Sequence, residues 1–258
     1  EGQNSWWESF RDSQTYLTSR AIEVLEIDAR WIAEQIYFEP EEGQGLRVWP
    51  DSRIRTGIVV GSVQSGKTAN MLAVSSMLLD KGVDIIVILC GTQISLWLQT
   101  YDRLLSQLDG TDTTNAYKRN SKRVIAPLPG DVLNNHGRLD PTQYFNGVKY
   151  SIKKALTKRL PIIVAIPKQT AHMQALKRCL RDCYTDKMFE NRGVPLRLVV
   201  LDDEADDASV LDSKKEEKLT PWNIQDFWSH EVENIETIHK DLYACYVAYT
   251  ATPQANFL

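Results

Sequence analysis

The chain has 258 residues, 43% of them hydrophobic, and a formal net charge of −4 at pH 7. A chain of this size can bury one large α/β core with additions, or at most two small domains, and its net negative charge excludes a generically basic nucleic-acid binder. The charge is uneven, because residues 118–197 hold 17 Lys and Arg against 5 Asp and Glu, a balance of +12, which leaves 13 against 29, or −16, for the remainder. This basic middle third suits either a polyanion-binding face or solvated helix faces, and charge alone favours neither.

The N-terminal segment Ser5–Phe38 places apolar residues at spacings near three and four among many charged ones, which is typical of amphipathic helices. Its aromatic residues are expected to pack in a core rather than to stack on bases. Residues 39–51 contain two prolines and two glycines and are expected to form a connector. We therefore predict a helical N-terminal extension over residues 1–50, ahead of the main domain over residues 51–258.

An eight-residue segment fits the pattern G-x-x-x-x-G-K-[ST] of phosphate-binding loops. It follows Gly57–Val60, a predicted buried strand, and precedes Ala69–Val74, which is predicted to be helical. The glycines let backbone N–H groups approach phosphate oxygens, the lysine is predicted to contact the terminal phosphates, and the threonine hydroxyl is predicted to ligate Mg²⁺. A chance match in a Gly/Ser turn is the alternative. The segment predicts ATP and Mg²⁺ as ligands, and its members are Gly61, Ser62, Val63, Gln64, Ser65, Gly66, Lys67 and Thr68.

Beyond this loop, apolar runs alternate with longer segments of helical pattern. The runs are predicted strands, at Asp84–Cys90, Val124–Pro127, Pro161–Ile166, Leu196–Leu201 and Tyr243–Tyr249. Helices are predicted from Gln93 to Leu108, from Val148 to Leu160, from Lys168 to Tyr184 and from Pro221 to Leu242. Continuous apolar runs are typical of strands buried on both faces, and long crossovers favour parallel pairing. The predicted fold is therefore α/β, with a three-layer, doubly wound, mostly parallel sheet.

A cluster of carboxylates, Asp202–Asp207, follows the predicted strand that ends at Leu201. Ligands of doubly wound folds bind at this end of the sheet. A metal-dependent NTPase needs one carboxylate in the Mg²⁺ shell and another that orients or deprotonates the attacking water. We assign the metal role to Asp203, with Asp202 as its competitor, and the catalytic, water-activating role to Glu204. An acidic loop that caps a helix is the structural alternative.

A second polar turn, Tyr249–Pro253, follows the last predicted strand. Its small hydroxyl residues, Thr250 and Thr252, suit hydrogen bonding to a neighbouring acidic loop and sensing of the γ-phosphate. Threonine and proline are also common where any strand enters a loop. The order and spacing of this turn after the acidic cluster favour the phosphate-sensing role over an ordinary strand end.

The three motifs together resemble the first RecA-like domain of superfamily 2 helicases and translocases. Asp203–Asp206 looks like the DEAD-type second motif of that family, and Thr250–Thr252 occupies the place of its Ser-Ala-Thr third motif. The resemblance implies that Asp206 contacts Thr250 or Thr252 and couples hydrolysis to domain movement.

The same resemblance implies contacts with a nucleic-acid backbone from Thr92 and Lys168, each of which follows a predicted strand. A lysine at the solvated start of a helix is the alternative for Lys168. Helicases of this superfamily place ATP between two RecA-like domains and take arginine fingers from the second. Because the numbered sequence ends soon after the third motif, we expect the second domain elsewhere in a full-length protein, and slow or no hydrolysis by this chain alone.

A narrower resemblance lies in the exact residues of the three motifs, in the segments Thr56–Thr68, Leu201–Asp206 and Tyr249–Asn256. These segments look like the Z-one domain family, often labelled as endonucleases and found in prokaryotic defence-type gene clusters beside MORC-like ATPases and restriction-type nucleases. The resemblance implies action on DNA and a nuclease or MORC-like ATPase as partner. Gln254 stands where an aromatic residue is expected, which argues against stacking at that position.

Three functions are therefore compared. The first is an ATP-dependent motor domain acting on nucleic acid, with DNA in a defence or restriction-like system favoured; the second is a nucleotide-gated scaffold that recruits a partner without unwinding. The third, a nuclease, requires an Asp and a Glu-x-Lys set around a metal. The nearest candidate, Glu216–Lys218, is better explained as a solvated charge run.

The four cysteines, Cys90, Cys179, Cys183 and Cys245, have no spacing typical of a disulfide framework. Cys179 and Cys183 are four residues apart on a predicted helix, but no nearby His or Cys pair completes a metal site. The sequence contains neither a signal-peptide pattern nor an apolar run long enough to span a bilayer. We expect a soluble cytoplasmic protein with no membrane partner.

Overall fold

A computed structural model of the chain describes residues 5–37, 48–61, 66–109, 124–126, 134, 136, 140–185, 194–205, 227–232, 235–238 and 242–251. Six strands form one sheet in the order β1-β8-β5-β2-β4-β3, and every neighbouring pair is parallel. The strands are β1 (Ile54–Val60), β2 (Ile85–Cys90), β3 (Val124–Ala126), β4 (Ile162–Pro167), β5 (Leu196–Asp202) and β8 (Leu242–Thr250). This arrangement confirms the α/β class and the parallel sheet expected from the continuous apolar runs.

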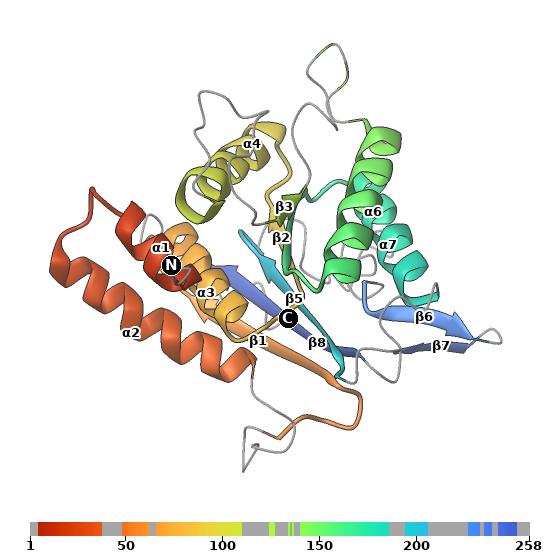
Figure 1. Ribbon diagram of the computed structural model, residues 1–258, viewed down its shortest axis with the longest axis horizontal. Helices are drawn as coiled ribbons and strands as arrows, with labels where there is room; N and C mark the ends of the chain where they lie inside the picture. Colours follow the sequence, from red (N-terminus) through yellow and green to blue (C-terminus); the bar gives the residue numbers. More distant parts are fainter. Residues whose placement is uncertain are drawn as a thin grey trace.

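The sheet is covered by helices on both sides of its central strands. All six residues of β2 and all six of β4 are buried, which requires cover on both faces. Figure 1 shows α3 and α4 to one side of these strands and α6 and α7 to the other. The helical segments after β1 are α3 (Lys67–Asp80), α4 (Ile94–Arg103), a π-helical continuation η2 (Leu104–Asp109), α6 (Pro141–Lys158) and α7 (Thr170–Thr185).

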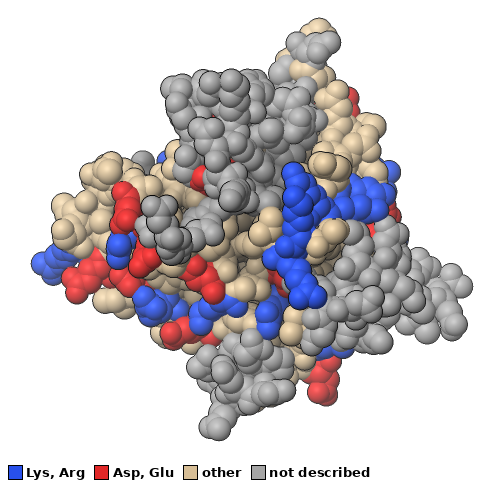
Figure 2. All heavy atoms as spheres, viewed as in Figure 1, with Lys and Arg blue, Asp and Glu red and all other residues tan. Residues whose placement is uncertain are grey.

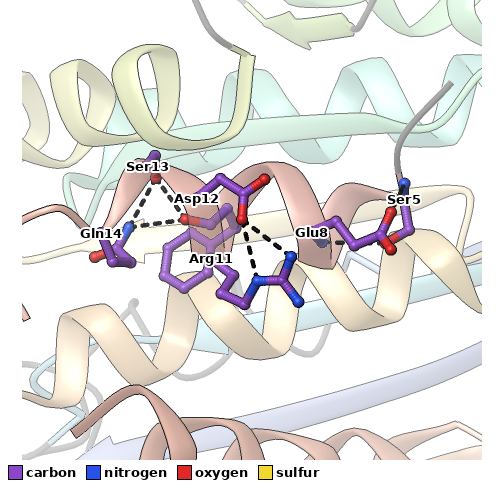
Figure 3. A network of polar contacts seen from close by, with 7 residues as sticks. Ser5, Glu8, Arg11, Asp12, Ser13 and Gln14 are labelled. Carbon is purple, nitrogen blue, oxygen red and sulfur yellow. Dashed lines mark hydrogen bonds and ion pairs between the residues drawn. The ribbon is translucent and has the colours of Figure 1, made fainter. Parts of the chain in front are cut away.

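Two N-terminal helices, α1 (Trp6–Ser13) and α2 (Ser19–Ile36), pack against α3 and share its core. Ser5 and Glu8 form a capping box at the start of α1, shown in Figure 3 with the polar network along that helix. The Asp80 carboxylate also accepts hydrogen bonds from the backbone amides of Trp6 (2.7 Å) and Trp7 (3.0 Å). A carboxylate at this position satisfies unpaired amides and complements the helix dipole, so α1 is fixed to the C-terminal end of α3.

The helix predicted from Pro221 to Leu242 is wrong where the structure describes it. Strands β6 (Ser229–Val232) and β7 (Ile235–Ile238) pair there as an antiparallel ribbon separate from the main sheet. Val232, Ile235, Thr237 and Ile238 are all β-branched, and such side chains lose rotamer freedom in a helix but fit a pleated strand.

The helix α6 begins at Pro141, seven residues before the predicted start at Val148. Asp140 caps it, because its side chain accepts hydrogen bonds from the backbone amides of Thr142 (2.9 Å) and Gln143 (3.0 Å). Proline is favoured at the first helical position, where no amide is needed. The Asp-Pro pair was therefore a helix-start signal ahead of the predicted start.

Basic residues of the middle third gather on α6 and α7, and Figure 2 shows Lys and Arg concentrated over that side of the molecule. Some of this charge is used internally, because Lys149 forms an ion pair with Asp182. Lys149 and Arg178 also lie over the ring of Phe145, with their charged groups 5.3 and 5.1 Å from its centroid. The polyanion-binding role of this surface remains a prediction.

His172 on α7 is a titratable side chain in the core. Its side chain is buried against Tyr144, the two rings are 5.6 Å apart, and neither ring nitrogen has a hydrogen-bond partner among the described residues. Burial lowers the pKa of His172 from its ordinary value of 6.5, against a smaller raising effect of Asp140. Below pH 6.5 the unfolded chain therefore binds a proton that the folded chain resists.

We expect the stability of the chain to fall as the pH is lowered from 7.5 to 5.5, because protonation of His172 favours unfolding. Urea unfolding midpoints at several pH values measure this loss, and His172→Phe should show a smaller loss over the same interval. The control is His136→Phe, which changes an exposed histidine. Identical pH profiles for wild type and His172→Phe would contradict the prediction.

Candidate functional site

The ends of three parallel strands bring the predicted motifs together at one edge of the sheet. Val60 at the end of β1 pairs with Thr250 in β8. Beyond these last paired residues, three further backbone hydrogen bonds join neighbouring strands. Gly61 N donates to Thr250 O (3.0 Å), Ala205 N donates to Tyr249 O (2.9 Å), and Asp203 N donates to Leu89 O (3.0 Å). These bonds fix the segments that follow β1 and β5 against the ends of β8 and β2.

At the described end of the phosphate-loop motif, Gly66 has a backbone conformation that suits a tight turn into a helix. Gly66 has φ +81°, a left-handed conformation that glycine adopts without a steric penalty, and it caps the start of α3. The Lys67 ammonium donates to the carbonyl oxygen of Gly61 (3.0 Å), so the last part of the motif contacts its first residue. Ser62, Val63, Gln64 and Ser65 lie outside the described residues.

Asp203 faces the loop, and Asp202 does not. The hydroxyl of Thr68 donates to Asp203 Oδ2 (3.4 Å), whereas Asp202 accepts a hydrogen bond from the Tyr246 hydroxyl (2.7 Å) and pairs with Lys168 (3.0 Å). Successive side chains of a strand point to opposite faces, which explains the division. Of the two carboxylates considered for the metal role, Asp203 is the one placed beside Thr68.

Thr68 and Asp203 together form a donor set that suits Mg²⁺. Both offer hard oxygen ligands, which this ion prefers, and Mg²⁺ is commonly held by few protein ligands and completed by water and phosphate. Burial raises the pKa of Asp203, while the Lys168 ammonium and the hydrogen bond from Thr68 act to lower it. An incoming cation would favour the charged carboxylate further.

Glu204 adopts an uncommon backbone conformation, with φ +55°. A non-glycine residue in this region carries a cost of roughly 1–2 kcal/mol, and such residues often occur at functional sites. Its side chain is exposed, and it lies against the backbone of Gly91 at the end of β2. A Cβ at Gly91 would lie 3.3 Å from Glu204 Oε2 and only 2.6 Å from Leu96 Cδ1, so a larger residue there would force the Leu96 side chain to move.

Lys168 has an internal position, which corrects the expectation that it contacts nucleic acid. Its side chain is 0% exposed, and Nζ donates to the carbonyl oxygens of Asp203 (2.8 Å) and Glu204 (2.6 Å) as well as pairing with Asp202. Its backbone N–H also donates to Gly91 O (2.9 Å). Lys168 thus holds the turn that presents Asp203 and Glu204, and it is a positioning residue.

Of the remaining predicted site residues, the structure describes some and not others. Thr250 is buried at the end of β8, between the strands that carry the loop and the acidic cluster. Thr92 is half-buried after β2, and its carbonyl accepts a hydrogen bond from Gln169 Nε2 (3.1 Å); its nucleic-acid role stays a prediction. Asp206 and Thr252 lie outside the described residues, as does Glu216–Lys218, so the coupling contact and the nuclease candidate stay untested.

A small hollow of about 80 Å³ lies among Thr68, Asp203 and Glu204, and polar residues of α4 that the sequence did not single out also line it. Gln99 and Arg103 are one helical turn apart on α4, and both are exposed. The hollow has room for a few waters, at about 30 Å³ each, or for a phosphoryl group. In the sequence, only the spacing of four residues between Gln99 and Arg103, on the predicted helix after β2, could have indicated that they lie on the same face.

The cysteines have no metal-binding arrangement in the part of the chain that the structure describes. All four are reduced and buried, and burial raises the pKa of Cys90 and of Cys179 to about 12. Among the described residues, no helix has both the length and the apolar character needed to cross a bilayer.

Comparison of the chain with protein-family models, curated proteins and solved structures found no match.

Proposed function

We propose that this chain is the ATP-binding domain of a helicase- or translocase-like ATPase that acts on nucleic acid. The contact between Thr68 and Asp203 carries the proposal, because it joins the phosphate-loop motif to the acidic motif at one sheet edge. In such a site Lys67 and the loop amides would hold the phosphates, while Thr68 and Asp203 would hold Mg²⁺. The metal would neutralise charge on the phosphates, and Glu204 would orient and deprotonate the attacking water.

The strand order supports a RecA-like domain with a three-layer, doubly wound sheet. The strand that ends in Thr250 lies between the loop strand β1 and the acidic strand β5, so a residue at its end is positioned to respond to both. This is the place where a γ-phosphate sensor is useful, since it can link hydrolysis to movement. A second RecA-like domain, a DNA substrate and a defence-type nuclease or MORC-like partner belong to the same proposal.

The binding step is tested with Lys67→Ala in the 258-residue chain. Removing a charged donor from the phosphates should weaken Mg²⁺–ATP binding by about 10- to 100-fold, because a hydrogen bond to a charged group contributes roughly 1.5–3 kcal/mol. Isothermal titration measures the affinity, and Lys81→Ala is the matched control, since Lys81 is exposed just after the other end of α3. Unchanged affinity in Lys67→Ala would contradict the proposal.

The same variant separates a motor from a scaffold in a full-length protein. A motor should lose DNA-stimulated hydrolysis with Lys67→Ala. A nucleotide-gated scaffold should show no DNA stimulation in the wild type and should lose capture of its partner in the variant. Metal-dependent DNA cleavage that survives Lys67→Ala would instead favour a nuclease.

A further inference from the structure

A second, larger hollow of about 690 Å³ lies beside the phosphate-loop motif. Figure 1 shows α2 running alongside α3 near β1, and residues of these three elements line the hollow. One wall consists of Ile27, Asp28, Trp31 and Ile32 from α2. Ligand pockets have volumes of roughly 300–1,000 Å³, so the hollow is large enough for a nucleoside.

The two hollows flank the start of α3. Lys67 lines the larger one together with Gly61, and the next residue, Thr68, lines the smaller one with Asp203 and Glu204. A nucleotide has the same division into a large, mostly apolar base and a compact, charged phosphate end that binds metal. A ligand whose phosphates lie at the loop would therefore have its base within reach of α2.

The chemistry of the larger hollow matches an aromatic base that carries an amino group. Trp31 is 64% exposed and Ile27 is 62% exposed, and both line the hollow, so they offer it adjoining apolar surface. The Asp28 carboxylate can accept from an exocyclic amine. Asn70 accepts a hydrogen bond from the Tyr249 hydroxyl through Oδ1 (3.3 Å), so its amide group is a donor suited to a ring nitrogen.

We propose, resting on the ATP-binding function above, that the face of α2 formed by Ile27, Asp28 and Trp31 binds the adenine base. Trp31 stacks on the base, Asp28 accepts from its 6-amino group, and Asn70 donates to its edge. A protein partner fits less well, because it would bury the charges of Asp28 and Lys67 against apolar surface. The N-terminal helices thus form part of the nucleotide site.

The test uses Mg²⁺ complexes of three probes: ATP, inosine triphosphate, which lacks the 6-amino group, and inorganic triphosphate, which lacks the nucleoside. Trp31→Ala should weaken ATP binding about tenfold, in line with measured base–aromatic stacking, and leave triphosphate binding unchanged. Asp28→Ala should reduce the preference for ATP over inosine triphosphate. Val24→Ala is the control, since Val24 is 52% exposed on the same helix but does not line the hollow.

The outcomes separate this inference from the function on which it rests. If the wild-type chain binds neither ATP nor triphosphate, the proposed function fails. If it binds both and Trp31→Ala leaves ATP affinity unchanged, or weakens both ligands equally, the base-binding role is wrong and the function stands. Concentration-dependent dimers that Trp31→Ala abolishes, with ATP affinity intact, would also overturn the inference, because the occupant would be a second copy.

Discussion

Glu204→Gln should abolish most ATP hydrolysis while leaving ATP binding nearly intact. A positioned general base contributes about 10²–10⁴-fold to a rate, and glutamine keeps the size of the side chain but cannot take a proton at neutral pH. The side chain lies beside the small hollow with Thr68 and Asp203, where a water can approach a bound phosphate. Single-turnover hydrolysis in the full-length protein, with and without DNA, measures the loss.

The binding measurement is the internal control for this variant. If Glu204→Gln binds Mg²⁺–ATP as wild type does and hydrolyses it 100 times more slowly or worse, the lost step is the chemical one. Glu23→Gln, on the exposed face of α2, should alter neither quantity. An unchanged rate in Glu204→Gln would show that another group activates the water, and Gln99 on α4 would be the next candidate to orient it.

Lys168→Met should reduce the free energy of unfolding by about 3–5 kcal/mol, because removal of one partner of a buried ion pair leaves the other charge uncompensated. Both side chains of the pair, Lys168 and Asp202, are 0% exposed. The variant also removes the ammonium that binds the carbonyl oxygens of Asp203 and Glu204, so ATP hydrolysis should fall with stability. Urea unfolding measures the first effect.

The double variant Lys168→Met/Asp202→Asn distinguishes charge from packing. It removes the uncompensated carboxylate while keeping an acceptor for the Tyr246 hydroxyl, so it should recover part of the lost stability. Lys154→Met, at an exposed position of α6, should change stability by no more than about 0.5 kcal/mol. If Lys168→Met were equally mild, the buried pair would have no structural role.

Much of the sheet could be predicted, since local sequence signals were strong. Continuous apolar runs marked β2, β4, β5 and β8, and the glycine and lysine spacing marked the start of α3. The ribbon of β6 and β7 was missed because Val232, Ile235 and Ile238 follow one another at intervals of three residues, a spacing that also fits a helix. For such a segment, the choice between helix and strand depends on local propensity, which tertiary contacts frequently override.

The candidate site could be predicted less completely, because its geometry depends on the order of strands. A lysine after an apolar strand looks the same in sequence whether it faces solvent or neighbouring carboxylates. Lys168 reaches the acidic turn only because β4 lies next to β2 and β2 lies next to β5, an order that no local pattern specifies. The sequence favoured Asp203 over Asp202 for the metal role, but only the structure shows which of the two carboxylates lies beside Thr68.

The hydrogen bonds from Trp6 and Trp7 to Asp80 bear on how the protein is divided for experiments. Nine consecutive residues of α3, Met71–Leu79, are buried, and a helix is buried all round only when both its sheet-facing and outer sides are covered. α1 and α2 supply that outer cover. An expressed fragment that begins at Asp51 would expose the outer side of α3 to water and should aggregate, so truncations made for crystallisation should start ahead of Ser5.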